Sequence, residues 1–374
     1  MQNQQYIKPD LLSVIEKFTN SHVSYGKAIC CPFHHEKDPS LHIYEDQHWY
    51  CFGCNRSGDA YDFYGYLRYG DAWDSKNPEM FREAAKMIRS SSCKSYVYTD
   101  EPKPQEKDVP PESYSVLKWV TNVYHRALLR ADDPAAAGAR KYLFERGYND
   151  DVIRRLKIGY AGHNVLYKKG LQLDAEKRIV YVEELKKLKL LNENGREYYY
   201  NRIIFPNVTK EGEVTNLTGR ALSKKAGKRY LNIPEFKKQL YLIGLSNPEL
   251  PLYLMESVTD TVSMRQLGYQ SVAVNGTALS KKMAASLDPF KKIIIVPQND
   301  LASQNAASTW CDMVPRCKVL LLDYVQGKQK DMNDILRQEG DVRAKAKIER
   351  ASEHLLEKDE YMHVVLDLFS RKEN

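Results

Sequence analysis

Residues 252–300 read LYLMESVTDTVSMRQLGYQSVAVNGTALSKKMAASLDPFKKIIIVPQND, and their pattern indicates the fold of the second half of the chain. The short apolar runs LYLMES, SVAVNG and IIIVPQ alternate with helical patterns, and a fourth run, VLLLDY, follows at residues 319–324. This alternation predicts a parallel sheet with helices on both faces. The charged residues beyond Asp334 predict a helical tail.

Acidic residues follow the predicted strands at the edge where open α/β sheets bind ligands and metal ions. Glu256 ends the first run, with Asp260 one helical turn later, Asp300 ends the third run, and Asp331 follows the fourth. A single Asp after a strand usually caps a helix. Three strand ends that meet at one edge instead predict a site for Mg²⁺ or Mn²⁺.

The segment before this sheet is basic. Residues from about 160 to 231 are rich in Tyr, Ile and Val, with turn signals at ENGRE and KEGEV, which predicts antiparallel strands. Arg220, Lys224, Lys225, Lys228 and Arg229 form a run without an acid. Planar guanidinium groups suit phosphate, whereas the two lysines Lys224 and Lys225 are more typical of a solvated loop.

Residues 114–160 predict helices, two of them joined at Gly147, and a proline-rich charged stretch at residues 99–113 predicts an exposed linker. About 95 residues precede it, which is a small domain in which a structural metal is most useful. The whole chain of 374 residues is 43% hydrophobic with a net charge of +7, so it can form real cores and suits a polyanionic partner without establishing one.

Four of the seven cysteines cluster in the small domain. Cys31-x2-His34 and Cys51-x2-Cys54 are two ligand pairs that predict one closed tetrahedral zinc site of structural type. Cys30 and His35 adjoin two of these ligands and remain alternatives to them. The grouping favours metal ligands in a reducing compartment over disulfides.

Aromatic and basic side chains surround the predicted zinc site, as in single-stranded nucleic-acid binding. Phe33 and Phe52 are expected to form the small core of the ribbon. Lys37, Trp49 and Arg56 are the candidates for nucleic-acid contact.

The stretch CPFHHEKDPSLHIYEDQHWYCFGCNRSGDAYDF closely resembles the zinc ribbon of bacterial DnaG-type DNA primases. YLFERGYNDDVIRRLKIGYA and NRIIFPNVTKEGEVTNLTGRALSKKAGKRYLNIP are similar to the catalytic core of that family, and the parallel-sheet segment resembles a TOPRIM domain. The resemblance implies an α+β multidomain protein. It would have a zinc ribbon (1–98), a linker (99–113), a mixed α/β basic subdomain (114–245), a TOPRIM subdomain with a Rossmann-like parallel sheet (246–338) and a helical tail (339–374).

The resemblance also implies a function, the template-directed synthesis of short RNA primers from NTPs on single-stranded DNA. Glu256, Asp300 and Asp331 would bind magnesium, with Glu256 assisting proton transfer, and Asp260, Gln298 and Asn333 are additional candidate ligands. The residues expected to hold template and nucleotide are Arg202, Arg220, Lys228 and Arg229.

The acidic motifs depart from the family pattern. Ser257 replaces a glycine, Gln298 replaces the leading acid of D-x-D-x-A-G, and Asn333 stands where a second acid is frequent. Two amides in place of carboxylates lower the affinity for a divalent ion. The alternative is therefore a primase-derived replication protein of a phage, plasmid or other mobile element that binds single-stranded DNA and is catalytically weakened or inactive. A TOPRIM nuclease is a weaker alternative because it leaves the zinc ribbon and the basic segment unexplained.

Further features of the sequence limit which partners and which location are expected. The sequence has no G-x-x-x-x-G-K-[ST] phosphate loop, so no fused helicase is expected. A replicative helicase or another replication protein is a further candidate partner, and a helicase would be met through a shortened contact, a different contact or another protein. No signal peptide and no membrane helix are expected, which favours the cytoplasm. The expected partners are single-stranded DNA, NTPs and the RNA–DNA primer duplex.

Overall fold

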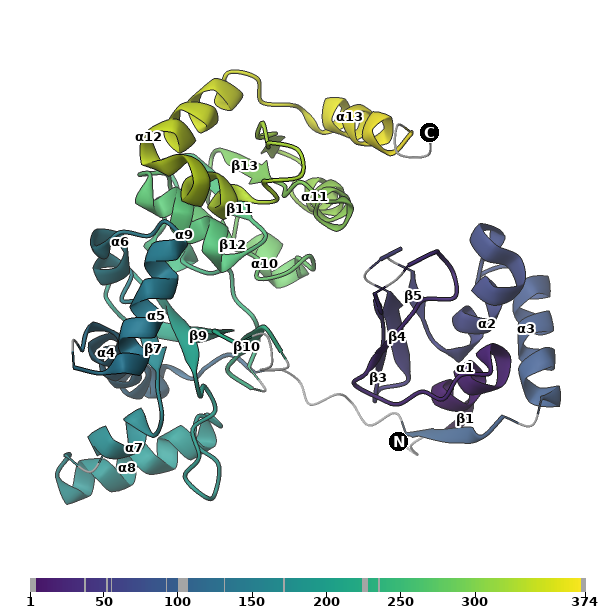
Figure 1. The fold of residues 1–374 in the computed structure, drawn as a ribbon, viewed down its shortest axis with the longest axis horizontal. Helices are drawn as coiled ribbons and strands as arrows, with labels where there is room; N and C mark the ends of the chain where they lie inside the picture. Colours follow the sequence, from purple (N-terminus) through teal and green to yellow (C-terminus); the bar gives the residue numbers. More distant parts are fainter. Residues whose placement is uncertain are drawn as a thin grey trace. The chain divides into compact units, whose positions relative to one another are not determined.

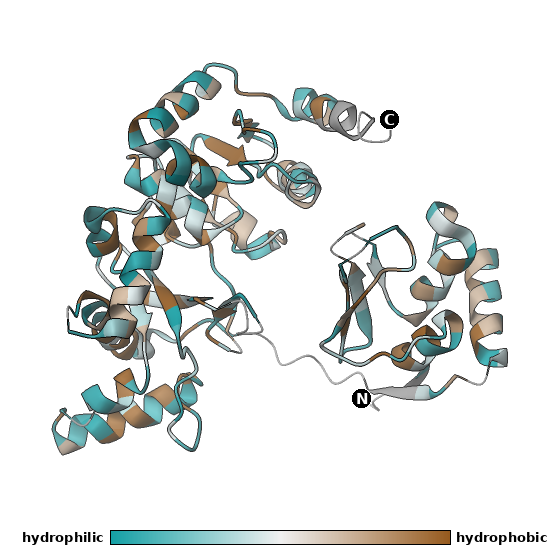
Figure 2. Cartoon of the chain, in the orientation of Figure 1, coloured by the Kyte–Doolittle hydropathy of each residue, from teal (hydrophilic) through white to brown (hydrophobic). Residues whose placement is uncertain are grey.

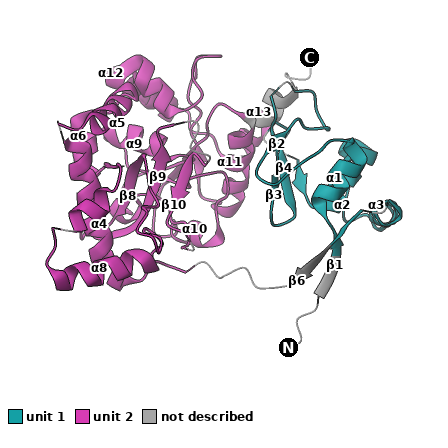
Figure 3. Cartoon of the chain, turned by 60° about the horizontal axis from the view of Figure 1, so that its bottom comes forward, with its two compact units in different colours: residues 1–104 teal, residues 105–374 magenta. Residues whose placement is uncertain are grey.

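The computed structural model describes residues 5–36, 38–51, 53–54, 56–91, 93–99, 107–130, 132–170, 172–223, 228–234 and 236–370. The side chains of residues 5–7, 96–99, 301 and 365–370 are not described. Lys37, Phe52, Lys224 and Lys225 therefore lie outside the described residues. The chain forms two compact units, residues 1–104 and 105–374 (Figure 3), and the finer boundaries at residues 113, 245 and 338 stay predictions.

The first unit is built on a four-stranded antiparallel sheet in the order β2-β3-β4-β5. Its strands are β2 (Ala28–Ile29), β3 (Leu41–Tyr44), β4 (His48–Cys51) and β5 (Ser57–Gly58). A second antiparallel pair joins β1 (Gln5–Pro9) to β6 (Ser95–Thr99). Three helices complete the unit: α1 (Leu11–Thr19), α2 (Ala60–Tyr69) and α3 (Pro78–Ser90), with the short 3-10 helix η1 (Gly70–Ala72).

Tight turns and caps set the helix starts in this unit. Asp59 accepts from the backbone N–H groups of Tyr61 and Asp62, and Asp62 accepts from the Asp59 N–H in return. This reciprocal cap satisfies donors that the first turn of a helix leaves unpaired. It fixes the start of α2 directly after the ribbon, so that Phe63 packs into the core beneath β4.

The second unit begins with three helices, which the hydrophobic spacing predicted. They are α4 (Tyr114–Leu129), after the 3-10 helix η2 (Pro111–Ser113), α5 (Pro134–Glu145) and α6 (Asp150–Arg155). Gly147 has φ +81°, a left-handed conformation that favours glycine, and it turns the chain between α5 and α6. The prediction of two helices joined at this glycine is confirmed.

An antiparallel sheet of order β10-β9-β8-β7 follows. Its strands are β7 (Gly159–Ala161), β8 (Arg202–Val208), β9 (Val214–Ala221) and β10 (Tyr230–Asn232). The prediction of strands from 160 to 231 was wrong between β7 and β8, where the chain forms α7 (Val165–Gly170) and α8 (Ala175–Lys187). Asp174 caps α8 by accepting from the Lys177 N–H at 2.8 Å, and the β-branched Ile179 and Val180 are exposed on this helix. These two residues favoured the prediction of a strand, because β-strand propensity depends on residue type and takes no account of tertiary contacts.

The last sheet is parallel throughout, as predicted, and its strand order is β12-β11-β13-β14. Its strands are β11 (Leu252–Met255), β12 (Ser271–Ala273), β13 (Ile293–Val296) and β14 (Lys318–Val319), preceded by the 3-10 helix η3 (Ile243–Leu245). The connecting helices are α9 (Val258–Gln266), α10 (Lys281–Ala285) and α11 (Leu301–Met313), and the tail forms α12 (Met332–Ser352) and α13 (Lys358–Ser370). Figure 1 shows these helices around the sheet.

Alternate residues of these strands enter two separate cores. Met255 and Val296 pack with α9 and α12, whereas Leu254 and Ile295 pack with α10 and α11. β13 is hydrophobic along its length, while α12 carries many polar residues (Figure 2). A strand buried on both faces reads as a continuous apolar run, which explains IIIV. This packing leaves only the strand ends available for polar side chains.

Among the helices of the described residues, none combines the length and the apolar character that are needed to cross a membrane.

Candidate metal and phosphate sites

The zinc ribbon brings four potential ligands together. One ligand atom from each of Cys31, His34, Cys51 and Cys54 lies within 4.8 Å of the others. The Cys31 and Cys54 sulfurs are 3.8 Å apart, as are the Cys51 sulfur and His34 Nδ1. Cys30 and His35 are exposed and stand outside this group. Three thiols and one imidazole form a closed donor set that fits a structural Zn²⁺.

Glu36 supports these ligands, and sequence reasoning missed this residue. Its Oε2 lies 3.0 Å from His34 Nε2, while its Oε1 accepts from the backbone N–H of Cys31 at 2.6 Å and of Ser40 at 3.1 Å. A carboxylate on the second ring nitrogen of a histidine orients the first nitrogen toward a metal. Nδ1 is therefore the ligand atom of His34. The H-x-E spacing two residues after His34 was the signal available in the sequence.

Trp49 does not offer a stacking surface, so its prediction as a nucleic-acid contact was wrong. The side chain is fully buried, its Nε1 donates to the Asp59 carbonyl at 2.9 Å, and its ring packs against Phe33 and Phe63 with centroids 5.1 and 5.5 Å away. Phe33 is in the ribbon core, as expected. The alternation along β4 turns Trp49 inward, because neighbouring residues of a strand point to opposite faces.

Arg56 is also occupied by the fold. It forms an ion pair with Asp71, donates to the Phe33 carbonyl at 2.8 Å, and lies over the ring of Tyr66 at 5.4 Å. These contacts tie the segment after the second ligand pair to the helices, and the contact of Arg56 with nucleic acid stays a prediction. Lys37, the remaining candidate of the ribbon, lies outside the described residues.

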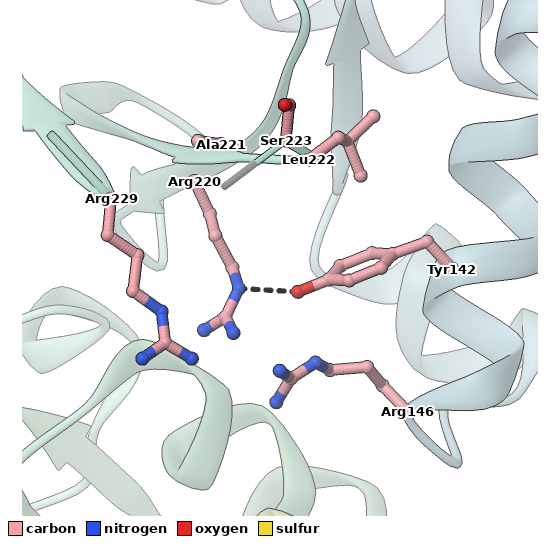
Figure 4. Close-up of a pocket in the computed structure, with 7 residues that line it drawn as sticks. All are labelled: Tyr142, Arg146, Arg220, Ala221, Leu222, Ser223 and Arg229. Atoms are coloured by element: carbon pink, nitrogen blue, oxygen red, sulfur yellow. Dashed lines mark hydrogen bonds between the residues drawn. The ribbon is translucent and has the colours of Figure 1, made fainter. Parts of the chain in front are cut away.

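A pocket of about 390 Å³ in the second unit gathers three arginines. Arg146 at the end of α5, Arg220 on β9 and Arg229 before β10 direct their guanidinium groups into one space (Figure 4). Tyr142 completes the wall, and its hydroxyl accepts from Arg220 Nε at 2.5 Å. Three guanidinium groups that point into one cavity are suited to bind phosphate groups.

Arg220 is held rigidly within this pocket. The residue is 3% exposed, it also donates to the Tyr230 hydroxyl, and its guanidinium lies over the rings of Tyr142 and Tyr230. Such stacking fixes the plane of a guanidinium group without neutralising its charge. Arg229 and Lys228 are exposed, so they can contact larger anions.

Arg202 does not line this pocket, and its contact with phosphate stays a prediction. The side chain is 5% exposed and donates to the backbone carbonyls of Lys228 at 2.8 Å, Arg229 at 3.2 Å and Gly219 at 3.3 Å. Arg202 thus positions the segment that carries Arg229. Its sequence neighbours gave no sign of this burial, because β8 is covered on both faces.

The acidic edge gathers the carboxylates that end the parallel strands. Glu256 is half-buried after β11, Asp300 caps α11 by accepting from the Ser303 N–H at 2.9 Å, and Asp331 caps α12 by accepting from the Asp334 N–H at 2.8 Å. Burial raises the pKa of Glu256, and repulsion from Asp300 and Asp331 raises it further. One oxygen of Glu256, Oε2, is buried without a hydrogen-bond partner. Burial and mutual repulsion oppose ionisation of these carboxylates, and one carboxylate oxygen lacks a partner, so the site is suited to bind a cation.

These carboxylates are spaced more widely than the zinc ligands. Among the described residues, the Cys and His group of the ribbon is the one set of three or more such ligand atoms within 4.8 Å of one another. A Mg²⁺ ion that keeps several waters needs only one or two direct carboxylate ligands, so the wider spacing is compatible with it.

The carboxylate of Asp260 is engaged by other protein groups. It is 1% exposed, and its carboxylate accepts from Ser257 Oγ at 2.6 Å, Gln298 Nε2 at 2.8 Å and the Asn333 N–H at 3.0 Å. Burial raises the pKa of Asp260 to about 8, with repulsion from Asp331 as the second cause. Ser257, which replaces the family glycine, caps α9 and donates to this carboxylate.

The two amides also have structural partners. Gln298 turns its amide nitrogen toward Asp260, as described above. Asn333 is fully buried, donates to Ser263 Oγ at 3.0 Å and to the Arg146 carbonyl at 2.9 Å, and accepts from Arg146 at 2.7 Å. Asn333 and Asp260 are thus engaged by other protein groups, whereas Glu256 keeps an oxygen without a partner. Metal binding by Glu256, Asp300 and Asp331, and by the additional candidates Asp260, Gln298 and Asn333, stays a prediction.

The arginine pocket adjoins the acidic edge within this unit. Arg146 lines the pocket and donates to Asn333, two residues after Asp331. Burial and Asp334 raise the pKa of Asp331, whereas the guanidinium groups of Arg146 and Arg220 oppose that rise. Arg146 was missed from the sequence, where it is one of several arginines in a helical pattern.

Comparison with known proteins gives three matching family models. Residues 6–84 match the CHC2 zinc finger, residues 124–249 the DNA primase catalytic core N-terminal domain, and residues 253–336 a Toprim-like domain. A DNA primase of Clostridium acetobutylicum is 30% identical over 80% of this chain and 50% of its own length, and one of Lactococcus lactis is 28% identical over 80% and 47%. The chain spans about half the length of these curated relatives.

Solved structures agree in fold. The catalytic core of the E. coli primase shares 25% identity at a TM-score of 0.54, with 68% of this chain and 83% of that one covered. The zinc-binding and RNA polymerase domains of the Aquifex aeolicus primase cover 92% of this chain and 83% of that one at 23% identity and a TM-score of 0.54. The predicted resemblance and fold class are confirmed: zinc ribbon, catalytic core and Toprim-like domain follow one another as expected.

Proposed function

We propose that this chain, which carries the zinc ribbon, catalytic core and Toprim-like domain of DnaG-type primases, is a primase that synthesises short RNA primers from NTPs on single-stranded DNA. The observation that carries this proposal is the junction of the arginine pocket with the acidic edge through Arg146. Transfer of a nucleotidyl group needs cationic groups for the triphosphate and a metal site beside them. The chain offers both within one unit.

The arginines would bind the triphosphate. Arg220, which the two tyrosines hold in place, and Arg146 would contact phosphate oxygens inside the pocket, and the exposed Arg229 would contact the outer phosphates or the template. Arg202 acts through Arg229 by holding its backbone. Lys228, exposed next to Arg229, would contact the template backbone.

The acidic edge would hold the divalent ion. Glu256, Asp300 and Asp331 would bind Mg²⁺ or Mn²⁺, which neutralises phosphate charge and favours ionisation of the attacking hydroxyl. Burial raises the pKa of Glu256, which makes this carboxylate a better proton acceptor than an exposed glutamate. Asp260 and Asn333 would position this edge by linking α9, β13 and α12.

The zinc ribbon would help to recognise the single-stranded template. The RNA–DNA primer duplex would be the product, and a replicative helicase would be a partner met in the cytoplasm. Structures similar to this chain include a primase catalytic domain described as bound to single-stranded DNA, which supports the template class proposed here.

A primer-synthesis assay with matched variants tests this function. We expect labelled oligoribonucleotides on single-stranded DNA with Mg²⁺ or Mn²⁺, and their loss in Glu256→Gln and Arg220→Met. Glu249→Gln is the control, because Glu249 pairs with Lys291 on the surface. No product from the wild-type chain under either metal, with DNA binding intact, would refute the proposal and favour an inactive DNA-binding relative.

A further inference from the structure

Lys330 places a positive charge at the acidic edge. Its Nζ lies 2.8 Å from Asp300 Oδ2, in the loop that leads to Asp331. The pairing raises the pKa of Lys330, and Glu256 and Asp331 add to the rise. The ammonium group therefore contacts Asp300 and also feels the charges of Glu256 and Asp331, the other two carboxylates that would bind a divalent ion.

The backbone of Lys330 is held on both sides. Its carbonyl accepts from the Asn299 N–H at 2.7 Å, and its own N–H donates to Asp334 Oδ2 at 3.0 Å. These bonds join the loop after β13 to the start of α12. The side chain itself is 62% exposed, so the ammonium group can leave Asp300 without disturbing either loop.

The acidic edge already carries less negative charge than the family pattern would give it. Gln298 and Asn333 supply amides where the family pattern has acids, and both amide groups are engaged with other protein groups. The ion pair with Lys330 offsets a further negative charge, that of Asp300. An ammonium group next to a carboxylate opposes binding of a second cation to the same oxygen.

We propose that Lys330 is a resident counter-ion of Asp300 that competes with the divalent cation, so that the cation gains Asp300 as a ligand only when the ammonium group moves away. This inference rests on the divalent site proposed above and is independent of primer synthesis. An exposed ion pair contributes little free energy, so the competition should weaken cation binding by about two- to fivefold. When the divalent cation is absent, Lys330 would keep the Asp300 carboxylate paired.

Calorimetric titration of the zinc-loaded full chain with Mn²⁺ tests this. We expect Lys330→Met to bind Mn²⁺ about two- to fivefold more tightly than the wild type. Lys328→Met is the matched control, since Lys328 is an exposed lysine of the same loop, and we expect it to bind Mn²⁺ as the wild type does. In the Asp300→Asn background, Lys330→Met should give no gain.

Two results would overturn the inference and leave the proposed function standing: equal or weaker Mn²⁺ binding by Lys330→Met, or the same gain in the Asp300→Asn background. A gain of equal size in Lys328→Met would likewise overturn it, because it would show a general charge effect. Absence of Mn²⁺ binding in the wild type and in every variant would overturn both the inference and the metal site of the proposed function.

Discussion

Gln298→Asp restores the leading acid of the family pattern, and we expect it to destabilise the metal-free protein. Gln298 is 8% exposed, and its Nε2 donates to Asp260 at 2.8 Å. An ionised carboxylate has no proton to donate, so this bond is lost and two acids face each other in a buried place. The substitution that looks like a repair therefore removes a contact on which Asp260 depends.

The size of the effect follows from the lost bond and from pH. Leaving a buried polar group without its partner costs about 1–3 kcal/mol. The pKa of Asp260 is about 8, so at pH 6 it is mainly protonated and can donate to the introduced carboxylate, whereas at pH 9 both groups are charged. The loss of stability should be small at pH 6 and should exceed the cost of the lost bond at pH 9.

Chemical denaturation of the full chain at pH 6 and pH 9, without divalent ions, measures this. Gln298→Met is the control, because it removes the hydrogen bond at similar volume without adding charge. A Gln298→Asp variant as stable as the wild type at pH 9, or one that differs from Gln298→Met by the same amount at both values of pH, would refute the reasoning.

Four further outcomes are expected. Asp260→Asn should flatten the pH dependence of the free energy of unfolding. The pKa of Asp260 is about 8 in the folded protein and near 3.8 in the unfolded chain, so the wild type loses stability as pH rises between about 4 and 8. Chemical denaturation across that pH range measures the difference between wild type and variant. Trp49→Ala should destabilise the first unit by about 3–5 kcal/mol, as measured by its unfolding transition, because a fully buried ring is removed. Chelation of zinc should unfold residues 1–104 and leave the unfolding transition of residues 105–374 unchanged, because the second unit has its own hydrophobic cores. Loss of both unfolding transitions in calorimetry would contradict this. Arg202→Met should lower the free energy of unfolding by about 1–3 kcal/mol, because three backbone carbonyls lose their hydrogen-bond donor. It should also weaken nucleotide binding in a fluorescence titration, and unchanged binding would exclude a role of Arg202 through Arg229.

Local patterns predicted the elements that carry regular signals. Four apolar runs gave the four parallel strands, and Gly147 gave the break between α5 and α6, because burial on both faces and a left-handed turn leave direct marks in the sequence. The paired spacing of the zinc ligands was equally informative, since two tight turns can meet at one ion.

Contacts between distant residues could not be predicted in this way. The Arg146–Asn333 pair spans 187 positions, and the contact between Gln298 and Asp260 spans 38. The residue types alone suggested lost metal ligands, whereas the structure shows amides that bind other protein groups. The same limit applies to Arg202, whose burial depends on the partner strands and not on its neighbours in sequence.

The central claim is that the acidic edge and the arginine pocket together form a working nucleotidyl-transfer site. The most direct measurement is incorporation of labelled ribonucleotides into new chains on single-stranded DNA by the wild-type protein, with Mg²⁺, with Mn²⁺ and with chelator. The account predicts template-dependent RNA with either ion and none with chelator. Template binding without any RNA product in either ion would contradict it.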